Sequence, residues 1–163
     1  MEKKKKEIAL DDVWLSYDEQ SSHPYSYKYP RWCVTADVVL FHRVDGKINL
    51  LLIQRGNEPY KGMWALPGGF VDVDEDVTTG ARRELKEETG IVVDDIHQLG
   101  CYSTPRRDPR APVLTIAHYA FTNNPNAIAG DDAAKAQWFD IYNLPTLAFD
   151  HAQIISDAIE RIK

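Results

Sequence analysis

Three glutamates close together on one predicted helix are the residues best placed to do chemistry. Glu84, Glu87 and Glu88 lie within "ARRELKEETG", one to four residues apart. Like charges at these spacings destabilise a helix by roughly 0.2–0.5 kcal/mol per pair. Carboxylates also supply the oxygen ligands that hard cations such as Mg²⁺ and Mn²⁺ prefer. A bound divalent cation would offset the repulsion, so the sequence suggests a metal site on these helix glutamates.

A helical projection at about 100° per residue places these acids beside the face that packs on the core. The apolar stripe of this helix consists of Val77, Ala81 and Leu85, and the helix glutamates border it. The opposite side, which we expect to face solvent, carries Thr79, Arg82 and Lys86. Carboxylates at the edge of a core have raised pKa values unless a cation lies among them. The arrangement therefore favours a ligand site over an ordinary amphipathic helix.

Gly80 lies on the acidic side of the same helix. Glycine lowers helix propensity by about 1 kcal/mol relative to alanine, so we expect Gly80 to clear space for a ligand. The alternative is a solvated charged helix in which the basic neighbours neutralise the glutamates. Those neighbours are Arg82, Arg83 and Lys86.

The flanking segments predict the elements that position this helix. "WCVTADVVLFHR" and "KINLLLIQR" are rich in β-forming residues and are separated by "VDG", so they predict a hairpin. Further strands are predicted at Pro112–Thr122 and Lys135–Asp140. A closing helix follows Asp150, the expected N-cap. Strands outnumber helices and most are joined directly, which indicates an α+β domain with a mixed, largely antiparallel sheet.

Length and composition predict one globular domain preceded by an arm. The chain has 163 residues, of which 44% are hydrophobic, enough for one core. Residues 1–30 are polar and aromatic without steady periodicity, so we expect an extended N-terminal arm, with the domain at residues 31–163. The arm is compatible with exchange between subunits of a homodimer.

Net charge and apolar patterning exclude several classes of partner. The formal charge of −6 argues against a nucleic-acid or membrane binder. No stretch approaches eighteen apolar residues, and no leader-like run follows the N-terminal lysines, so we expect a cytoplasmic protein. Cys33 and Cys101 have no C-x-x-C spacing and are expected to be reduced, buried thiols.

The segment from Gly69 to Ile91 resembles the Nudix box, G-x5-E-x7-R-E-U-x-E-E-x-G-U, where U is aliphatic. All fixed positions match, which is far more specific than a lone glycine-rich loop. They are Gly69, Glu75, Arg83, Glu84, Leu85, Glu87, Glu88, Gly90 and Ile91. The resemblance implies the Nudix fold, an α/β/α sandwich around a mixed sheet. It also implies hydrolysis of a nucleoside diphosphate linked to another group.

The resemblance also implies roles for the residues of the box. The helix glutamates would bind the divalent cation, Mg²⁺ or Mn²⁺, and the Gly69 carbonyl would be a further ligand. Arg83 would pair with Glu75 and hold the start of the helix against its loop. The cation would neutralise the diphosphate and activate the attacking water.

A segment downstream of the box bears on the substrate. Pro105 stands fifteen residues after the last glycine of the box, and the "TPRRDPR" that contains it resembles the loop of Nudix enzymes acting on ADP-ribose. Arg106, Arg107 and Arg110 could clamp a terminal phosphate through forked hydrogen bonds. The alternative is that these arginines pair with Asp108 in a solvated turn. Relatives often have glycine where Arg106 stands.

Other candidates are single residues. Arg55 corresponds to a basic residue that lies near the phosphates in relatives, and the alternative is a surface role. Asp131 and Asp132 follow a loop that often supplies an acid, with Asp132 preferred as general base; the alternative is an ordinary aspartate turn. An adenine would stack on an aromatic ring, and the candidates are Tyr27, Tyr29 and Trp32.

Three functions are compatible with these residues. The first is a metal-dependent hydrolase that cleaves ADP-ribose to AMP and ribose 5-phosphate. The second is a pyrophosphohydrolase of damaged nucleoside triphosphates. The third is a non-catalytic sensor that binds ADP-ribose and regulates transcription. The complete box, and a chain that reaches Lys163 without a predicted DNA-binding domain, favour an enzyme with a small-molecule nucleotide substrate.

Overall fold

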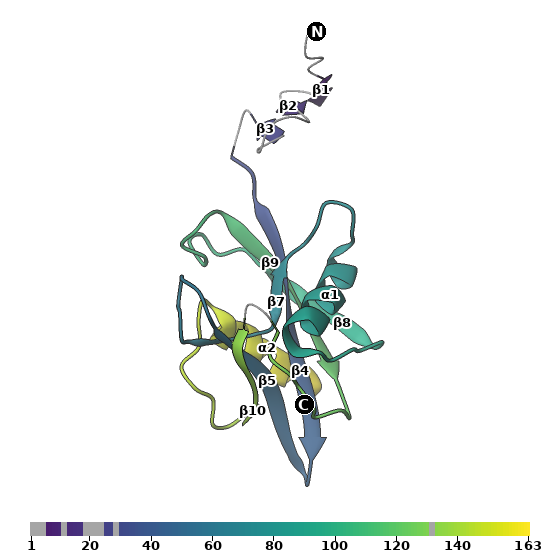
Figure 1. Ribbon diagram of the computed structural model, residues 1–163, viewed down its shortest axis with the longest axis vertical. Helices are drawn as coiled ribbons and strands as arrows, with labels where there is room; N and C mark the ends of the chain where they lie inside the picture. Colours follow the sequence, from purple (N-terminus) through teal and green to yellow (C-terminus); the bar gives the residue numbers. More distant parts are fainter. Residues whose placement is uncertain (1–5, 11–12, 18–24, 28–29, 131–132) are drawn as a thin grey trace. The chain divides into compact units, whose positions relative to one another are not determined.

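The computed structural model describes residues 6–10, 13–17, 25–27, 30–130 and 133–163 (Figure 1). The chain divides into two compact units, residues 1–32 and 33–163. In the first unit an antiparallel sheet replaces the extended arm that the sequence predicts. Its strands pair in the order β1-β2-β3 and are β1 (Lys6–Leu10), β2 (Val13–Tyr17) and β3 (Tyr25–Tyr27). Pairing satisfies backbone groups that an isolated arm would leave to water.

A seven-stranded sheet forms the centre of the second unit. Its main path is β10-β5-β4-β9-β8; β6 pairs with β5 and β7 with β4. β4 and β9 are parallel and the other pairs are antiparallel, so the predicted mixed sheet and the β4–β5 hairpin are confirmed. The strands are β4 (Cys33–Val44), β5 (Lys47–Arg55), β6 (Trp64–Ala65), β7 (Gly68–Phe70), β8 (Ile96–Tyr102), β9 (Val113–Phe121) and β10 (Ala133–Asp140).

Two helices cover opposite faces of this sheet. Side chains of β4 alternate between two cores: Val38 packs with α1 (Val77–Thr89), and Val39 packs with α2 (His151–Ile162). In Figure 1, α2 (yellow) lies behind the sheet. A strand buried on both faces explains why "VTADVVLF" is a nearly continuous apolar run. The α/β/α sandwich is therefore confirmed. Neither α1 nor α2, the helices of the described residues, is long and apolar enough to cross a membrane.

The two helices start differently. In α1 the Asp76 side chain accepts hydrogen bonds from the N–H groups of Thr78 and Thr79, both at 3.0 Å. Asp150 is the N-cap residue of α2, as predicted, but its side chain makes no capping hydrogen bond. The carboxylate is instead bound by Arg107 from a distant loop.

The two cysteines are free thiols, but both are exposed rather than buried as expected. Cys33 is the first residue of β4, where the strand enters the sheet. Cys101 lies on β8, the edge strand, whose outer side is not covered by another strand of the sheet. Strand propensity alone does not reveal which side chains of an edge strand face solvent.

Packing of α1 on the sheet should depend on Leu85, which is fully buried. We expect Leu85→Ala to lower the free energy of unfolding by about 2–5 kcal/mol, because it removes buried methyl groups and leaves a cavity. Lys86→Ala, one residue along on the exposed side of α1, should change it by less than about 0.5 kcal/mol. Urea unfolding followed by circular dichroism measures both, and equal losses would contradict this packing.

Candidate active site

The glutamates of α1 meet the glycines of β7. The Gly68 N–H donates a hydrogen bond of 2.8 Å to Oε2 of Glu88. A Cβ added to Gly69 would lie 2.5 Å from Oε1 of Glu84, so only glycine allows this carboxylate to approach the strand. Because β7 pairs with β4, the sheet fixes where both carboxylates lie.

Arg83 connects the helix glutamates to the loop before α1. Its Nε and Nη2 bind the two carboxylate oxygens of Glu75 at 3.1 and 2.5 Å, and Nη2 also donates to the Phe70 carbonyl at 3.0 Å. Nη1 donates to Glu84 at 2.7 Å and to Glu87 at 3.1 Å. These bonds raise the pKa of Arg83 and lower that of Glu75. The pairing of Arg83 with Glu75 suggested by the resemblance is thus present.

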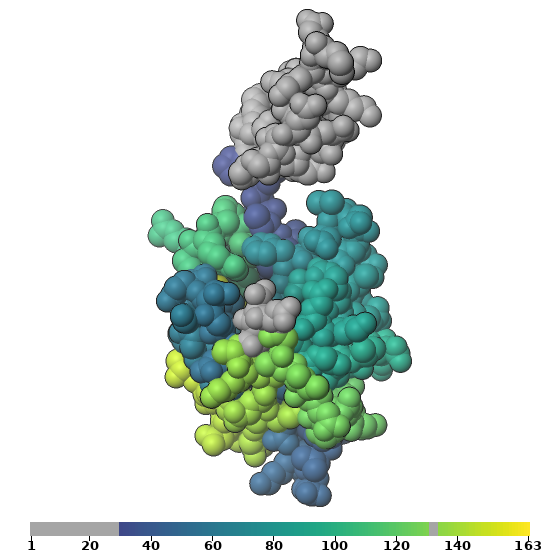
Figure 2. All heavy atoms as spheres, viewed as in Figure 1, coloured from purple at the N-terminus to yellow at the C-terminus, as the bar shows by residue number. Residues whose placement is uncertain are grey.

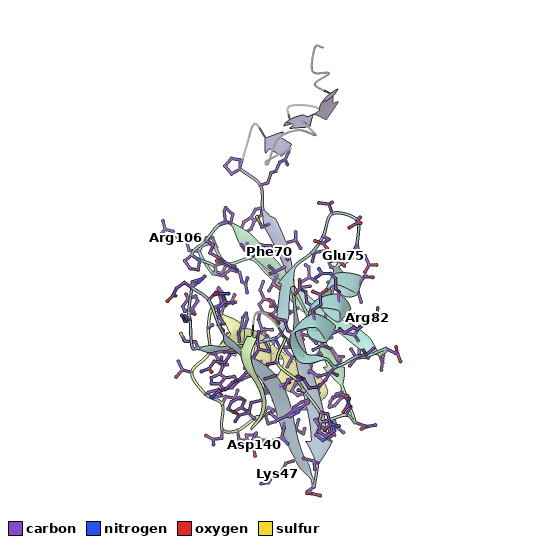
Figure 3. The ribbon with its side chains drawn as sticks, in the orientation of Figure 1. Lys47, Phe70, Glu75, Arg82, Arg106 and Asp140 are labelled. Atoms are coloured by element: carbon purple, nitrogen blue, oxygen red, sulfur yellow. The ribbon has the colours of Figure 1, made fainter. Side chains whose placement is uncertain are left out.

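The alternative for this helix is that its basic neighbours neutralise the glutamates. Of the three basic neighbours, only Arg83 contacts them. Arg82 is exposed, donates to the Asp94 carbonyl at 2.9 Å and points away from β7 (Figure 3). Lys86 is exposed on the same side of the helix. One guanidinium therefore binds three carboxylates: those of Glu84 and Glu87 on α1 and that of Glu75 before the helix.

Gly80 clears space for a side chain of the protein and not for a ligand. A Cβ at this position would lie 2.8 Å from Oε1 of Glu75. The same oxygen accepts a hydrogen bond from the Asp72 N–H at 2.9 Å. Gly80 thus lets Glu75 bridge the helix and its preceding loop, which corrects the expectation from the sequence.

Burial dominates the electrostatics of the two inner glutamates. It raises the pKa of Glu88 to about 8, with further repulsion from Glu84 and Asp37, against the opposing Gly68 N–H and Arg55. Burial also raises the pKa of Glu84, although its hydrogen bond from Arg83 acts in the opposite direction. Both carboxylates are therefore costly to ionise without a cation. This is the condition that the sequence predicts for a metal site.

A pocket opens beside these glutamates, and Gly68 and Gly69 form part of its wall. In Figure 2, the segment 56–62 and the loop 103–111 lie on one side of this face of the molecule and α1 lies on the other. The charged and aromatic side chains of the wall include Asp37, Arg55, Phe70, Arg110, Phe149 and His151. The pocket thus combines cations and aromatic faces next to a carboxylate cluster.

Two of the loop arginines are paired within the protein. Arg107 is buried and binds both oxygens of Asp150, at 2.8 and 2.6 Å. Arg110 binds both oxygens of Asp108, with the shorter contact at 2.7 Å. The side chain of Arg110 is nevertheless 41% exposed and its guanidinium lies 5.3 Å from the centre of the Phe70 ring. Arg110 therefore pairs with Asp108 as the alternative interpretation has it, but Asp108 is buried rather than solvated, and Arg110 still lines the pocket.

The remaining substrate candidates separate into two groups. Arg55 lines the pocket, donates to the Pro59 carbonyl at 2.7 Å and lies 4.9 Å from the centre of the Phe149 ring. Its pKa is lowered, first by burial and then by Arg110. Pro105 and Arg106 are exposed outside the pocket wall, and Arg106 points outward from the loop (Figure 3). The structure brings Arg55 and Arg110 together but not Arg106.

Several pocket residues were missed by the sequence analysis. Asp37 left a readable signal, since a charged residue inside the apolar run "VTADVVLF" is buried only at a cost. Phe149 and His151 left none, because the turn that brings them to the pocket depends on distant contacts. Asp131, Asp132, Tyr29 and the side chain of Tyr27 lie outside the described residues. Trp32, the other aromatic candidate, is exposed and belongs to the first unit.

Comparison with known proteins identifies the family. A family model described as the NUDIX domain matches residues 31–158. The chain belongs to the Nudix family. The ADP-ribose pyrophosphatase of Methanocaldococcus jannaschii is 49% identical over 118 residues, which cover 70% of each protein. The family match and this identity make the chain a Nudix pyrophosphohydrolase.

Other Nudix relatives include regulators. The ADPR responsive transcriptional repressor NtrR of Acinetobacter baylyi is 34% identical over 82% of this chain and 56% of the repressor. A MutT/nudix family protein from Enterococcus faecalis superposes with a TM-score of 0.78 at 36% identity, over 83% of this chain and 63% of that one. The NUDIX domain of Shewanella oneidensis NrtR, complexed with ADP ribose, gives 0.76 at 34% identity, over 83% and 91%. This Nudix chain thus spans only part of several relatives.

The raised pKa of Glu88 predicts a pH dependence of stability in the metal-free Nudix protein. The carboxyl releases its proton near pH 4.5 when unfolded and at about 8 when folded. The folded state holds an extra proton between these values, so the free energy of unfolding should fall as pH rises from about 4.5 to about 8. In Glu88→Gln this slope, up to about 1.4 kcal/mol per pH unit, should be absent.

Urea unfolding in EDTA from pH 5 to 9 measures this difference. The free energy of unfolding of the variant should rise relative to that of the wild type up to about pH 8, the folded-state pKa. Above this pH the difference between the two free energies should be constant. Glu160→Gln, on the exposed side of α2, serves as the control and should show no such trend. A difference between Glu88→Gln and wild type that did not vary with pH would contradict the burial of this carboxyl.

Proposed function

We propose that this Nudix protein hydrolyses the pyrophosphate bond of ADP-ribose, giving AMP and ribose 5-phosphate, with Mg²⁺ or Mn²⁺ bound. The observation that carries the proposal is the position of the pocket. Carboxylates of α1 adjoin a wall that includes Arg55 and Arg110, besides Arg107, which is bound to Asp150, and the aromatic rings of Phe70 and Phe149. The name of the relative that is 49% identical supports ADP-ribose as the substrate.

The donors around α1 are of the type that a hard divalent cation binds, although no three acidic, histidine or cysteine side chains among the described residues are already grouped as a metal site. Glu84 and Glu88 are held against Gly69 and Gly68, and the neighbouring donors are oxygens, the type that Mg²⁺ and Mn²⁺ prefer. We propose the helix glutamates and the Gly69 carbonyl as the ligands. A cation bound there would neutralise charge on the diphosphate and lower the pKa of the attacking water. Arg83 and Glu75 hold the ligand-bearing helix in position, and Asp132 stays a predicted general base.

The pocket residues would orient the substrate for this reaction. The guanidinium groups of Arg55 and Arg110 would bind phosphate or ribose oxygens, and Phe70 or Phe149 would pack against the base. The oxygen of one water attacks one phosphorus, the bond from that phosphorus to the bridging oxygen breaks, and the second phosphate leaves with the bridging oxygen. Water provides the protons, so each product ends as a phosphate monoester. Pro105, Arg106 and Arg107 stay predictions for indirect roles, through the shape of the loop.

A coupled phosphatase assay tests the proposal over a panel of ADP-ribose, other ADP-sugars, NADH and damaged nucleoside triphosphates. We expect Mg²⁺-dependent turnover with ADP-ribose preferred, and its loss in EDTA. Glu87→Gln should lower kcat at least about 100-fold, because even supporting residues of metal sites affect activity 10- to 100-fold. The fold should be kept, since Glu87 is 59% exposed. Glu160→Gln is the control.

Other outcomes of the panel select the alternative functions. Preference for triphosphates would keep the chemistry of the helix glutamates and remove the role of the loop 103–111 in specificity. Binding of ADP-ribose without cleavage would favour a sensor, and the similarity to the ADP-ribose-responsive repressor gives that outcome a specific precedent. A homodimer, a cytoplasmic location and the absence of nucleic-acid partners stay predictions from the sequence.

Two arginines of the loop should differ in what their removal affects. Arg110→Ala should weaken ADP-ribose binding roughly 10- to 100-fold, as expected for a lost charge-assisted hydrogen bond. Arg107→Ala should instead lower the free energy of unfolding by roughly 3–5 kcal/mol, because it leaves the carboxylate of Asp150 without its partner. Isothermal titration and urea unfolding of both variants measure the contrast. Equal effects on binding at unchanged stability would contradict it.

A further inference from the structure

Asp37 and His151 face each other across a gap in the wall of the pocket, and neither has a part in the function proposed above. Nε2 of His151 lies 4.0 Å from Oδ2 of Asp37, which is too long for a hydrogen bond between them. Both residues line the pocket. The side chains of Asp37 and His151 are 9% and 5% exposed, so a group bound between them would be largely shielded from bulk water.

The backbone fixes which nitrogen of His151 is the donor. The Leu66 N–H donates a hydrogen bond of 2.9 Å to Nδ1 of His151, so Nδ1 acts as an acceptor and the neutral ring carries its proton on Nε2. Burial lowers the pKa of His151, in agreement with a neutral ring. The imidazole therefore presents an N–H donor to the gap.

The acceptor on the other side of the gap is fixed by β7. Asp37 lies opposite Gly68 in the register of β4 with β7, and a Cβ added to Gly68 would lie 2.6 Å from Oδ1 of Asp37. Oδ1 is therefore held against β7, and Oδ2 is the oxygen nearer to His151. Because Asp37 belongs to β4 and His151 begins α2, both sides of the gap lie on regular secondary structure.

A hydroxyl group of a ligand fits this gap in both size and chemistry. An oxygen with hydrogen bonds of about 2.8 Å to both atoms spans about 4 Å when the angle between the two bonds is near 90°. That oxygen must accept a proton from Nε2–H and donate its own to the carboxylate. A hydroxyl does both, whereas an ionised phosphate oxygen cannot donate and an ammonium group cannot accept. The gap therefore favours a hydroxyl over a charged group.

The neighbours of the gap indicate what kind of molecule carries this hydroxyl. Arg55 and Arg110 line the same pocket, and Asp37 lies close enough to attract both guanidinium groups. A ligand whose phosphate meets these arginines would bring a hydroxyl only a few bonds away to the gap. The ribose phosphate units of a nucleotide have hydroxyls in this relation to their phosphates.

We propose that Asp37 and His151 form a subsite for the 2- or 3-hydroxyl of a ribose of the substrate. The hydroxyl would accept a hydrogen bond from Nε2–H of His151 and donate one to Oδ2 of Asp37. The inference rests on the hydrolysis of ADP-ribose proposed above. It adds two specificity-determining residues that lie outside the Nudix box, one on β4 and one at the start of α2.

Deoxy analogues of ADP-ribose, each lacking the 2- or 3-hydroxyl of one of the two riboses, test this inference. In the wild type, the analogue without the bound hydroxyl should have a kcat/KM roughly 10- to 100-fold below that of ADP-ribose, as for a lost hydrogen bond to a charged group. The analogue that shows this loss identifies the ribose that occupies the subsite.

Two variants should remove this preference for ADP-ribose over the affected analogue. Asp37→Asn removes the charge at nearly constant size. His151→Asn removes Nε2–H but keeps an acceptor for the Leu66 N–H. In each variant the preference should fall below about threefold, because the partner of the hydroxyl is gone. Asp94→Asn, which changes an exposed aspartate in the turn before β8, should keep the wild-type preference.

The ratio of the two kcat/KM values separates hydroxyl binding from a purely structural role. A structural role would lower kcat/KM for ADP-ribose and its analogue alike, and an unchanged preference in the variants would overturn the proposal. Either variant alone decides this, so the test stands if the other does not fold. A wild type that cleaved all analogues as well as ADP-ribose would also overturn the subsite and leave the proposed function in place. No cleavage of ADP-ribose by the wild type would instead contradict that function.

Discussion

The approach of β7 to the acidic side of α1 determines where the carboxylates of the helix lie. Two glycines allow it: Gly68 donates its N–H to Glu88, and Gly69 leaves room for Glu84. Because β7 is paired to β4, the carboxylates are fixed relative to the sheet and not only to their own helix. Burial at this contact raises the pKa values of Glu84 and Glu88, and the two glycines form part of the pocket wall.

The carboxylates around α1 in this Nudix domain are unequally neutralised by neighbouring donors. Arg83 serves the outer side of the cluster, where it binds Glu75, Glu84 and Glu87. The inner side, with Glu88 and Asp37, receives one backbone N–H, a distant imidazole and the nearby charge of Arg55. Arg83 thus balances part of the charge of Glu84 and Glu87, whereas burial raises the pKa of Glu88. A cation would therefore gain the most favourable electrostatic energy on the inner side, next to Glu88 and Asp37.

Sequence reasoning succeeded where the signal is local. Spacing within α1 predicted the core positions of Ala81 and Leu85, although Val77 of the same stripe is only partly buried. The two β-rich runs on either side of "VDG" form the predicted hairpin. It failed where a contact joins distant segments. The sequence places Asp150 at the start of α2, but it does not show that Arg107, 43 residues earlier, binds both oxygens of its side chain. The sequence likewise suggests free space beside Gly80, but the carboxylate of Glu75, from the loop before α1, occupies this space.

The bond between Arg107 and Asp150 has a consequence for how the pocket meets its ligand. It ties the loop 103–111 to the first residue before α2, so the wall is assembled before any ligand arrives. Little conformational entropy then remains to be lost on binding. Such a pocket selects its ligand by shape complementarity and not by folding around the ligand.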